Sequence, residues 1–418
     1  MHIAIDIYDI SATGGLERFS ISFANSMRDC GHRISCFTSS HANVPACYPL
    51  ASDITVKSYP FTGDAASIPI LRQQVLDCSP DIFISPASFN NPLLWCAVLA
   101  GTGIPLVYSE HSDPWKIESE RWNQAERQAV LWAADAVHLL LPPYLQSVPE
   151  ALRHKCHVIP NPVPPANLEH RPCPEKPHIL SLGRLNHVKQ IPLLVQAFEL
   201  LAADFPQWEL HIWGSGEEEK AIRKAVARTA YSERIRICGL TTEPDQQFCK
   251  ADIFCIPSRF EGFGLTVVEA FTHGVAVVGF QDCSGVNSLI RSEHNGLLAP
   301  QMTAASLAQS LRRLMEDAPL RQRMGTAARE SARAFAPERI YDQWEAMLVQ
   351  AAARKGQTQL SKLYSDENCS PEEAAWRATM REVLQRPNVL LQNRQIFRRF
   401  LRRHPALKSA LKRVLGRK

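Results

Sequence analysis

The chain lacks the sequence features of several large protein classes. Its 12 cysteines include no C-x-x-C pair, which argues against a zinc site and against a small disulfide-stabilised domain and favours a reducing compartment. No G-x-G-x-x-G motif follows a predicted strand, so the dinucleotide-binding fingerprint is absent. The first apolar run contains Asp6 and Asp9 and has no basic segment before it. We therefore expect no secretory signal peptide.

An unbroken apolar run long enough to cross a membrane is also missing. The longest uncharged stretch is residues 82–109, and five residues that disfavour a helix interrupt it: Pro86, Pro92, Gly101, Gly103 and Pro105. A membrane-spanning helix needs about 20 consecutive apolar residues. We therefore expect this stretch to form a buried strand, a short helix and a second strand.

An excess of positive charge is missing except at the end of the chain. The 418 residues carry 46 Lys and Arg against 42 Asp and Glu, a net charge of +4. Residues 391–418 hold ten of those cations and no Asp or Glu, which leaves 36 basic and 42 acidic side chains elsewhere. This distribution excludes a nucleic-acid-binding surface that extends over the whole chain.

Short β-rich runs alternate with longer helical patterns, which is typical of parallel sheets with crossover helices. Ten strands are predicted, at residues 2–7, 33–38, 81–85, 105–109, 136–140, 178–182, 208–213, 235–238, 253–257 and 275–280. A proline-rich segment that includes Ile159-Pro160-Asn161-Pro162 divides them into two sets and predicts a stiff linker. We expect an α/β fold with two doubly wound domains that face each other across a cleft.

Helical patterns close the second half, at residues 304–315, 319–335 and 337–353. The polar segment 354–371 follows, and we expect the globular body to end near it. Residues 354–418 are then predicted to form a polar linker and a basic amphipathic helical tail.

A diglycine turn, Gly14-Gly15, follows the first predicted strand and precedes a predicted helix at residues 16–29. Backbone N–H groups and the helix dipole at such a turn favour a bound anion. A diglycine turn with only a structural role is also common, so both interpretations stay open from this motif alone.

Two cations, Arg184 and Lys189, stand on the loop after the predicted strand 178–182. This loop lies at the carboxyl edge of the second sheet, where open α/β sheets bind ligands. A guanidinium and a nearby ammonium suit a departing diphosphate, whose charge grows as the bond to it breaks. The alternative is a pair of solvated surface cations.

Two glutamates mark the loop and helix after the predicted strand that ends at residue 257. Glu261 lies in the loop and Glu269 a turn or so into the helix. Carboxylates accept paired hydrogen bonds from vicinal hydroxyls, so the pair predicts a sugar on one side and a ribose on the other. The amides of Phe263, Gly264 and Leu265 would meet a phosphate or hydroxyl between them. A surface position for Glu269 is the alternative.

Four motifs in this order resemble the retaining glycosyltransferases of family 4, the glycosyl transferase group 1 family, which have the GT-B fold. They are the Gly14-Gly15 turn, the Gly183-Arg184…Lys189 segment, the Trp213-Gly214-Ser215-Gly216-Glu217 turn, and Glu261 and Glu269 with seven residues between them. The resemblance covers about residues 1–350, and the glutamate pair is its most specific element.

The resemblance implies two Rossmann-like domains: an acceptor-side domain at residues 1–165 and a nucleotide-sugar donor domain at 166–353. The last helix of the second domain is then expected to pack back on the first.

Two departures from the family pattern stand out. Gln190 occupies a position where the family often has Gly, and residues 284–288 contain no carboxylate where the family often has an acid, which affects any donor contact made there.

The resemblance also implies roles for individual residues. Arg184 and Lys189 would neutralise the donor's diphosphate, and Glu269 would hold the ribose. Glu261 would hold the transferred sugar. The remaining assignments are donor contacts from the amides of Phe263, Gly264 and Leu265, an approach to the phosphates by Gly14 and Gly15, and a place near the sugar for His111, with Glu110 a weaker candidate.

We therefore expect a retaining, metal-independent glycosyltransferase that moves a sugar from a UDP- or GDP-type donor to an acceptor hydroxyl. The catalytic residues would be Glu261, Arg184, Lys189 and His111, with no cofactor, since the nucleotide-sugar is a substrate. The pathway would be bacterial-type cell-surface polysaccharide, lipopolysaccharide or glycolipid biosynthesis. The alternatives are a GT-B-shaped sugar-nucleotide epimerase and a non-catalytic subunit that binds a nucleotide or a partner.

The basic tail, residues 391–418, has apolar residues at helical spacing among its ten cations, on both sides of Pro405. Two short basic amphipathic helices are typical of attachment to an anionic membrane surface. A helix that binds a partner protein, a non-specific nucleic-acid contact and a solvated tail remain alternatives. We expect a cytoplasmic protein that is peripheral on the cytoplasmic face of the membrane, with a glycan or lipid-linked glycan acceptor and no specific nucleic-acid partner.

Overall fold

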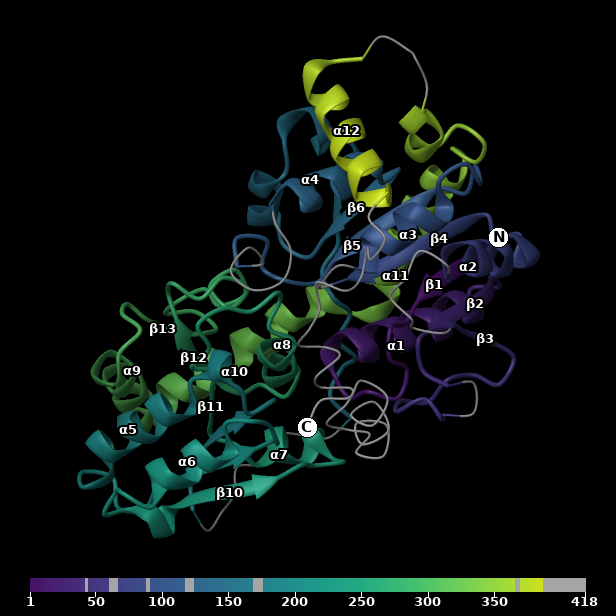
Figure 1. Cartoon of the computed structure of the whole chain (residues 1–418). Coiled ribbons are helices and arrows are strands. Elements are labelled where there is room, and N and C mark those ends of the chain that lie inside the picture. The colour runs from purple at the N-terminus through teal and green to yellow at the C-terminus, as the bar shows by residue number, and fades with distance from the viewer. Residues whose placement is uncertain are drawn as a thin grey trace, which may run out of the picture.

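Two parallel sheets form the body of the molecule (Figure 1). The computed structural model describes residues 1–41, 44–59, 67–87, 91–116, 124–167, 176–364 and 369–385. The predicted tail at 391–418 therefore lies outside the described residues.

The first sheet has seven strands in the order β3-β2-β1-β4-β5-β6-β7, all parallel. The order reverses between β1 and β4, which are neighbours in the sheet. The strands are β1 (His2–Asp6), β2 (Arg33–Thr38), β3 (Thr55–Ser58), β4 (Ile82–Ala87), β5 (Leu106–Glu110), β6 (Ala136–Leu139) and β7 (Cys156–Val158).

The second sheet has six parallel strands in the order β10-β9-β8-β11-β12-β13. Its order reverses between β8 and β11. The strands are β8 (His178–Leu182), β9 (Glu209–Trp213), β10 (Ile235–Gly239), β11 (Ile253–Cys255), β12 (Ala276–Phe280) and β13 (Gly296–Ala299).

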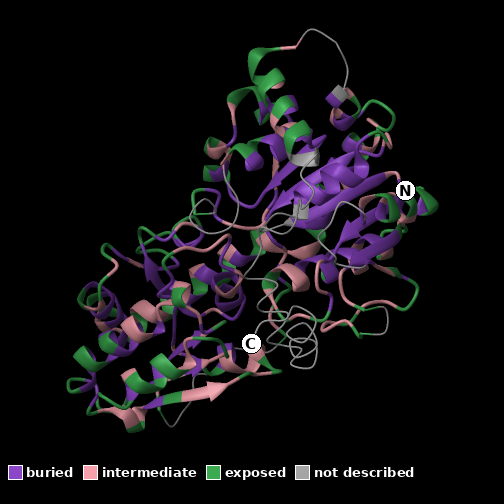
Figure 2. Ribbon diagram, viewed as in Figure 1, coloured by how far each residue is buried: buried purple, intermediate pink, exposed green. Residues whose placement is uncertain are grey.

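Helices cover both faces of each sheet, so the central strands are buried on both sides (Figure 2). Every residue of β1 and β12 is buried, which explains why residues 3–5 of β1 and all of β12 appear in the sequence as continuous apolar runs. The helices are α1 (Gly15–Asp29), α2 (Ser67–Cys78), α3 (Asn91–Leu99), α4 (Gln124–Ala133), α5 (Ile191–Ala202), α6 (Glu219–Val226), α7 (Pro244–Lys250), α8 (Leu265–Thr272), α9 (Ala304–Glu316), α10 (Ala318–Ala332), α11 (Pro337–Ala352) and α12 (Pro371–Gln385).

The predicted two-sheet α/β architecture is confirmed, and the ten predicted strands are present with ends that differ by at most two residues. Three further strands, β3, β7 and β13, were not expected. Each has only three or four residues and lies at a sheet edge, where the apolar pattern is weakest.

The uncharged stretch 82–109 folds as β4, α3 and most of β5, as predicted. In the described part of the chain, no helix combines the length and apolar character that a membrane crossing requires.

The chain returns to the first domain through α11. Trp344 of this helix is fully buried, with its ring 4.9 Å from the ring of Phe23 and 5.6 Å from that of Phe19, both on α1. Aromatic pairs at this separation contribute more stabilising free energy than the burial of their surface alone provides. This cluster joins α11, the last helix within the predicted bounds of the second domain, to the first helix of the chain.

The expectation that the globular body ends near residues 354–371 is wrong. Helix α12 packs against α4 on the first domain (Figure 1). Trp376 of α12 stacks on Trp132 of α4 with ring centres 6.3 Å apart. Trp376 and Met380 are buried. They lie four positions apart and so share one face of the helix. The body therefore continues at least to α12, because a polar connection does not prevent the next helix from docking.

Candidate active site

The residues singled out from the sequence gather where the two sheets face each other. The Gly14-Gly15 turn follows β1, Arg184 follows β8 and Glu261 follows β11. These three strands flank the points at which the strand order of each sheet reverses. Loops at such points form the ligand-binding crevice of open α/β sheets.

The loop after β8 presents the two predicted phosphate-binding cations. Arg184 is exposed and donates a hydrogen bond of 3.1 Å to the carbonyl of Thr13, in the loop before α1. Asn186 caps the following short turn by accepting from the amide of Lys189 at 3.2 Å. Both cations line a small hollow together with Gly183 and other residues at the ends of β8 and β11.

Gln190, one of the two departures from the family pattern, has φ of +46°. This left-handed conformation favours glycine, which explains why Gly is common at the position. The loop nevertheless keeps the shape that brings Lys189 to the site. The substitution therefore costs some backbone strain and removes no charge.

Lys189 and Glu261 form an ion pair between the loops after β8 and β11. The ammonium Nζ lies 2.5 Å from Oε1 of Glu261. The two side chains are only 20% and 15% exposed, so bulk water screens the pair incompletely. The geometry joins the predicted phosphate and sugar contacts into one polar cluster.

Helix α8 points its amino terminus at the same cluster. Its N-cap, Gly264, has φ of +92°, which an L side chain rarely adopts. The first amides of any α-helix have no partner within the helix, so those that follow Gly264 suit an anion or hydroxyl. The side chain of Phe263 is buried against Phe335, with ring centres 5.7 Å apart, and only its backbone is suited to ligand contact.

Glu269 is buried on α8 and pairs with Arg18, which comes from α1 of the first domain. The charge of Glu269 raises the pKa of Arg18 further, despite the opposing effect of burial. Arg18 was not predicted as a site residue, although it follows the Gly14-Gly15 turn by one helical turn. That spacing places it near the turn and could have identified it.

The loop that carries Glu261 is held by both domains. Tyr144 OH contacts the carbonyls of Glu261 and Gly262 at 3.0 and 2.9 Å, and the amide of Glu261 donates to the carbonyl of Ser284 at 3.0 Å. A Cβ on Gly262 would collide with the carbonyl oxygen of His111. Tyr144 was not predicted, and no motif around it in the sequence indicates the role.

The second departure, the acid missing from residues 284–288, has a counterpart in the fold. The Ser284 hydroxyl donates to the carboxylate of Asp113, a buried residue of the first domain. A carboxylate therefore does lie against this segment, although it comes from a distant part of the chain. Sequence spacing within the second domain could not reveal it.

His111 lies directly after β5, with its ring 4.4 Å from the ring of Phe19 and its Nε2 2.8 Å from the hydroxyl of Ser109. Burial holds the pKa of His111 well below its usual value, and the neighbouring His138 lowers it further. The imidazole is therefore neutral at pH 7.

Glu110, the weaker candidate beside His111, is not part of the site. It is fully buried and accepts two hydrogen bonds of 2.7 Å from the guanidinium of Arg127. Tyr108 OH donates to it at 3.0 Å. The carboxylate is thus fully engaged in holding β5 to α4.

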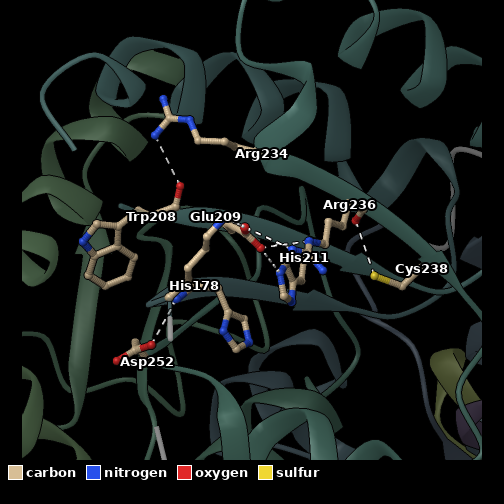
Figure 3. Close-up of polar contacts among 9 residues, drawn as sticks. His178, Trp208, Glu209, His211, Arg234, Arg236, Cys238 and Asp252 are labelled. Carbon is tan, nitrogen blue, oxygen red and sulfur yellow. Dashed lines mark hydrogen bonds and ion pairs between the residues drawn. The ribbon is translucent and has the colours of Figure 1, made fainter. Parts of the chain in front are cut away.

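A second polar cluster lies at the amino ends of strands in the second sheet, away from the strand ends that carry the candidate site (Figure 3). Burial raises the pKa of Glu209, but hydrogen bonds from His211, Lys176 and Arg236 outweigh this effect and hold it at about 2. Glu209 begins β9, so the cluster is at the amino ends of the strands. It ties the sheet edge together, remote from the loops that face the first domain.

Comparison with known proteins agrees with the two-sheet fold. Residues 13–167 match the model of Glycosyltransferase Family 4, and residues 169–331 match the model of Glycosyl transferases group 1. A crystal structure of Anabaena HepE in complex with UDP-glucose superposes with a TM-score of 0.70 at 18% identity, over 84% of this chain and 100% of that one.

Two curated relatives share part of their length with this chain. An exopolysaccharide phosphotransferase of Streptomyces coelicolor is 27% identical over 69% of the chain, and a poly(glycerol-phosphate) alpha-glucosyltransferase of Bacillus subtilis is 31% identical over 46% of it. The chain spans only 28% of the length of each. The two family models together cover most of the chain, one on each sheet domain, and the chain belongs to the GT-B glycosyltransferases.

Proposed function

We propose that the chain transfers a sugar from a nucleoside diphosphate sugar to an acceptor hydroxyl, with retention at the anomeric carbon. The observation that carries the proposal is the convergence of Arg184, Lys189 and Glu261 with the Gly14-Gly15 turn between the two sheets. A diphosphate in this place would meet a guanidinium, an ammonium and the amino termini of α1 and α8.

These groups suit the charge that develops when the sugar leaves. Negative charge grows on the diphosphate in the transition state, and fixed positive groups stabilise it without reorganisation. Ser258 adds a hydroxyl that lines the same hollow as Arg184 and Lys189 and has no hydrogen-bond partner within the described residues. An unsatisfied buried hydroxyl is costly, and a donor oxygen would satisfy it.

The two glutamates are assigned to the two sugars of the donor. Glu261 lies beside Lys189 and would accept from hydroxyls of the transferred sugar. Glu269, deeper along α8, would accept from the ribose. Each carboxylate is paired with a cation, Glu261 with Lys189 and Glu269 with Arg18, and these charge-assisted contacts hold it in place. His111 would contact the transferred sugar from the first domain.

The reaction would proceed on one face of the sugar. The acceptor hydroxyl attacks the anomeric carbon as the bond to the diphosphate breaks, and the leaving phosphate takes the proton of the acceptor. The protein then contributes orientation and charge stabilisation rather than a nucleophile. Arg184 and Lys189 supply the positive charge that a divalent cation supplies in other phosphate-transfer sites.

The names of the relatives support a pathway. One acts on an exopolysaccharide and another on poly(glycerol phosphate), while Anabaena HepE holds UDP-glucose. We infer that this chain uses a UDP- or GDP-sugar to build a bacterial-type cell-surface polysaccharide, lipopolysaccharide or glycolipid.

A panel of UDP- and GDP-sugars tests the function. One donor should raise the melting temperature and be slowly hydrolysed to the nucleoside diphosphate, and NMR of the released sugar should show the donor's anomeric configuration first. Formation of an epimeric nucleotide-sugar would favour the epimerase. Binding without turnover in the presence of glycan acceptors would favour the non-catalytic subunit, and no binding would contradict the proposal.

We also propose that residues 391–418 attach the enzyme to an anionic membrane on the cytoplasmic face, on the strength of their ten cations and absent acids. Deleting them should abolish sedimentation with phosphatidylglycerol vesicles while donor binding persists. High salt should mimic the deletion, because the Debye length is about 10 Å at 0.1 M salt. Equal vesicle binding by the truncated chain would contradict the proposal.

A further inference from the structure

A chain of three hydrogen bonds connects the candidate site with the interdomain linker. Nε2 of His111 lies 2.8 Å from the Ser109 hydroxyl, which lies 2.7 Å from Nδ1 of His138. Nε2 of His138 lies 2.6 Å from the carbonyl oxygen of Ile159, at the start of the proline-rich linker. Ser109 and His138 are both fully buried.

The Ile159 carbonyl at the end of this series of hydrogen bonds determines where each hydrogen in the series lies. The Ile159 oxygen can only accept, so Nε2 of His138 carries a hydrogen. Burial without a carboxylate partner lowers the pKa of His138 to about 3, so the ring is neutral and Nδ1 is an acceptor. Ser109 has one hydrogen and donates it to that Nδ1. Its oxygen then accepts from His111, whose Nε2 must carry a hydrogen.

The opposite ring atom of His111 is therefore fixed as well. His111 is neutral, so its Nδ1 has no hydrogen and is an acceptor. No hydrogen-bonding group contacts this atom within the described part of the chain. The His111 carbonyl packs against Gly262, in the loop that carries Glu261, so the residue borders the place assigned to the transferred sugar.

We propose that the Ile159 carbonyl, through His138 and Ser109, locks His111 in the Nε2–H tautomer and reserves its Nδ1 as an acceptor for a hydroxyl of the transferred sugar. Ser109 and His138 are then positioning residues. The inference rests on the proposed function for the identity of the ligand, whereas the tautomer itself depends only on the fold.

The lock has a consequence for donor choice. An acceptor nitrogen pairs with a hydroxyl and is repelled by a carboxylate, which offers no hydrogen at neutral pH. The site should therefore favour a neutral hexose over the corresponding hexuronic acid at the group that meets His111. A His111 free to change tautomer would lose part of this discrimination.

Long-range ¹H–¹⁵N NMR of the ¹⁵N-histidine-labelled full chain tests the lock without any ligand. The His111 ring, assigned by its disappearance in His111→Gln, should show a protonated Nε2 and an unprotonated Nδ1. In Ser109→Ala the Nδ1 resonance should move toward the average of the two tautomers. A protonated Nδ1 in the wild type, or an unchanged resonance in Ser109→Ala, would overturn the lock.

Ser85→Ala is the matched control. Ser85 is a buried serine on the adjacent strand β4, beside Tyr108 of β5, and its hydroxyl has no partner among the described residues. Both variants remove one buried hydroxyl from the same sheet. Only Ser109→Ala should change the His111 resonances, so a similar change in Ser85→Ala would point to a general loosening of the fold and against the lock.

Adding nucleotide-sugar donors tests the second part of the proposal, the contact between His111 Nδ1 and the transferred sugar. The His111 Nδ1 resonance should move when UDP-hexose or GDP-hexose is added and stay in place with UDP or GDP alone. Ser109→Ala should lower kcat/KM for the hexose donor about fivefold, the worth of one net hydrogen bond, and lower it less for the hexuronic acid donor. If His111 keeps the Nε2–H tautomer but its Nδ1 resonance does not move when a donor binds, only the proposed sugar contact is overturned. Failure of every donor to bind would overturn the proposed function with it.

Discussion

At the residue scale, opposite charges are paired across the candidate site before any ligand is considered. Lys189 holds Glu261 and Arg18 holds Glu269, and the second pair crosses between domains. Arg184 instead donates to a carbonyl of the opposite domain. It is therefore the cation best placed to receive a diphosphate, with Lys189 next to it.

Replacing either cation with alanine should impair the reaction and spare the fold. Arg184→Ala and Lys189→Ala should each raise the activation free energy by at least about 2–3 kcal/mol, the range seen when one preorganised charged or hydrogen-bonding group is removed. Neither side chain is part of the apolar core, so the melting temperature should barely change. Rates of donor hydrolysis and thermal unfolding measure the two effects.

Arg223→Ala is the control for these variants. Arg223 is exposed on α6, and among the residues that the structure describes it pairs only with Glu219, one turn away. This change should leave activity unaltered. Near-wild-type turnover in both Arg184→Ala and Lys189→Ala would refute the phosphate role.

The buried His138 should make stability depend on pH. Its pKa is about 3 in the fold and about 6.5 in the unfolded chain, so protons bind preferentially to the unfolded state below pH 6.5. The contribution of His138 is complete above pH 6.5 and declines by about 1.4 kcal/mol per pH unit between 6.5 and 3. Urea unfolding at pH 7 and pH 5 should show a smaller difference for His138→Gln than for the wild type. An equal difference would contradict the burial argument.

At the element scale, loops at the ends of β1, β5, β8 and β11 carry the site, and the sequence predicted most of them. The strands are buried on both faces, so each appears as an apolar run with a clear end, and the chemistry-bearing residues follow that end. Arg18, Tyr144 and Asp113 were not predicted as site residues. Each acts across the domain interface, and no local pattern encodes which loop of the other domain it will meet.

Gly262→Ala should disable the loop that carries Glu261. The added Cβ would collide with the His111 carbonyl, and relieving such overpacking costs about 1–3 kcal/mol. The loop must move away from the first domain, so kcat/KM should fall at least about tenfold, which corresponds to about 1.4 kcal/mol. Steady-state kinetics and thermal unfolding measure activity and stability separately.

The control is Gly31→Ala, at a glycine with φ of +86° and no atom within 4 Å of the added Cβ. It should lose stability through backbone strain of about 1–2 kcal/mol and keep full activity. Full activity in Gly262→Ala as well would show that the close approach of this loop to the first domain is not required.

At the scale of the whole molecule, two helices that follow the strands of the second sheet in sequence pack on the first domain. Helix α11 docks through Trp344 on α1, and α12 docks through Trp376 on α4. The docking of α12 was not predicted, because its polar approach segment resembles a linker and its apolar face has only a few residues. Such long-range packing depends on the complementary face of α4, which the local pattern does not reveal.

The charge arrangement between the domains predicts that the reaction tolerates removal of divalent cations. In the proposed site, Arg184, Lys189 and the helix amides would supply the positive charge for the departing diphosphate. Activity with the preferred donor should persist in excess chelator at pH 7. Loss of activity that Mg²⁺ restores would contradict this electrostatic account.

The central claim is that one donor site is built jointly by both domains. Calorimetric titration of the full chain with UDP and GDP tests it most directly, on the wild type, Lys189→Ala and Gly15→Val. Gly15 belongs to the first domain, and a Cβ there would lie 3.3 Å from Leu265 of the second, so valine should crowd the cleft. The account predicts one nucleotide bound per chain and at least about tenfold weaker binding in both variants, or about 1.4 kcal/mol each. Nucleotide binding that neither variant weakens would contradict it.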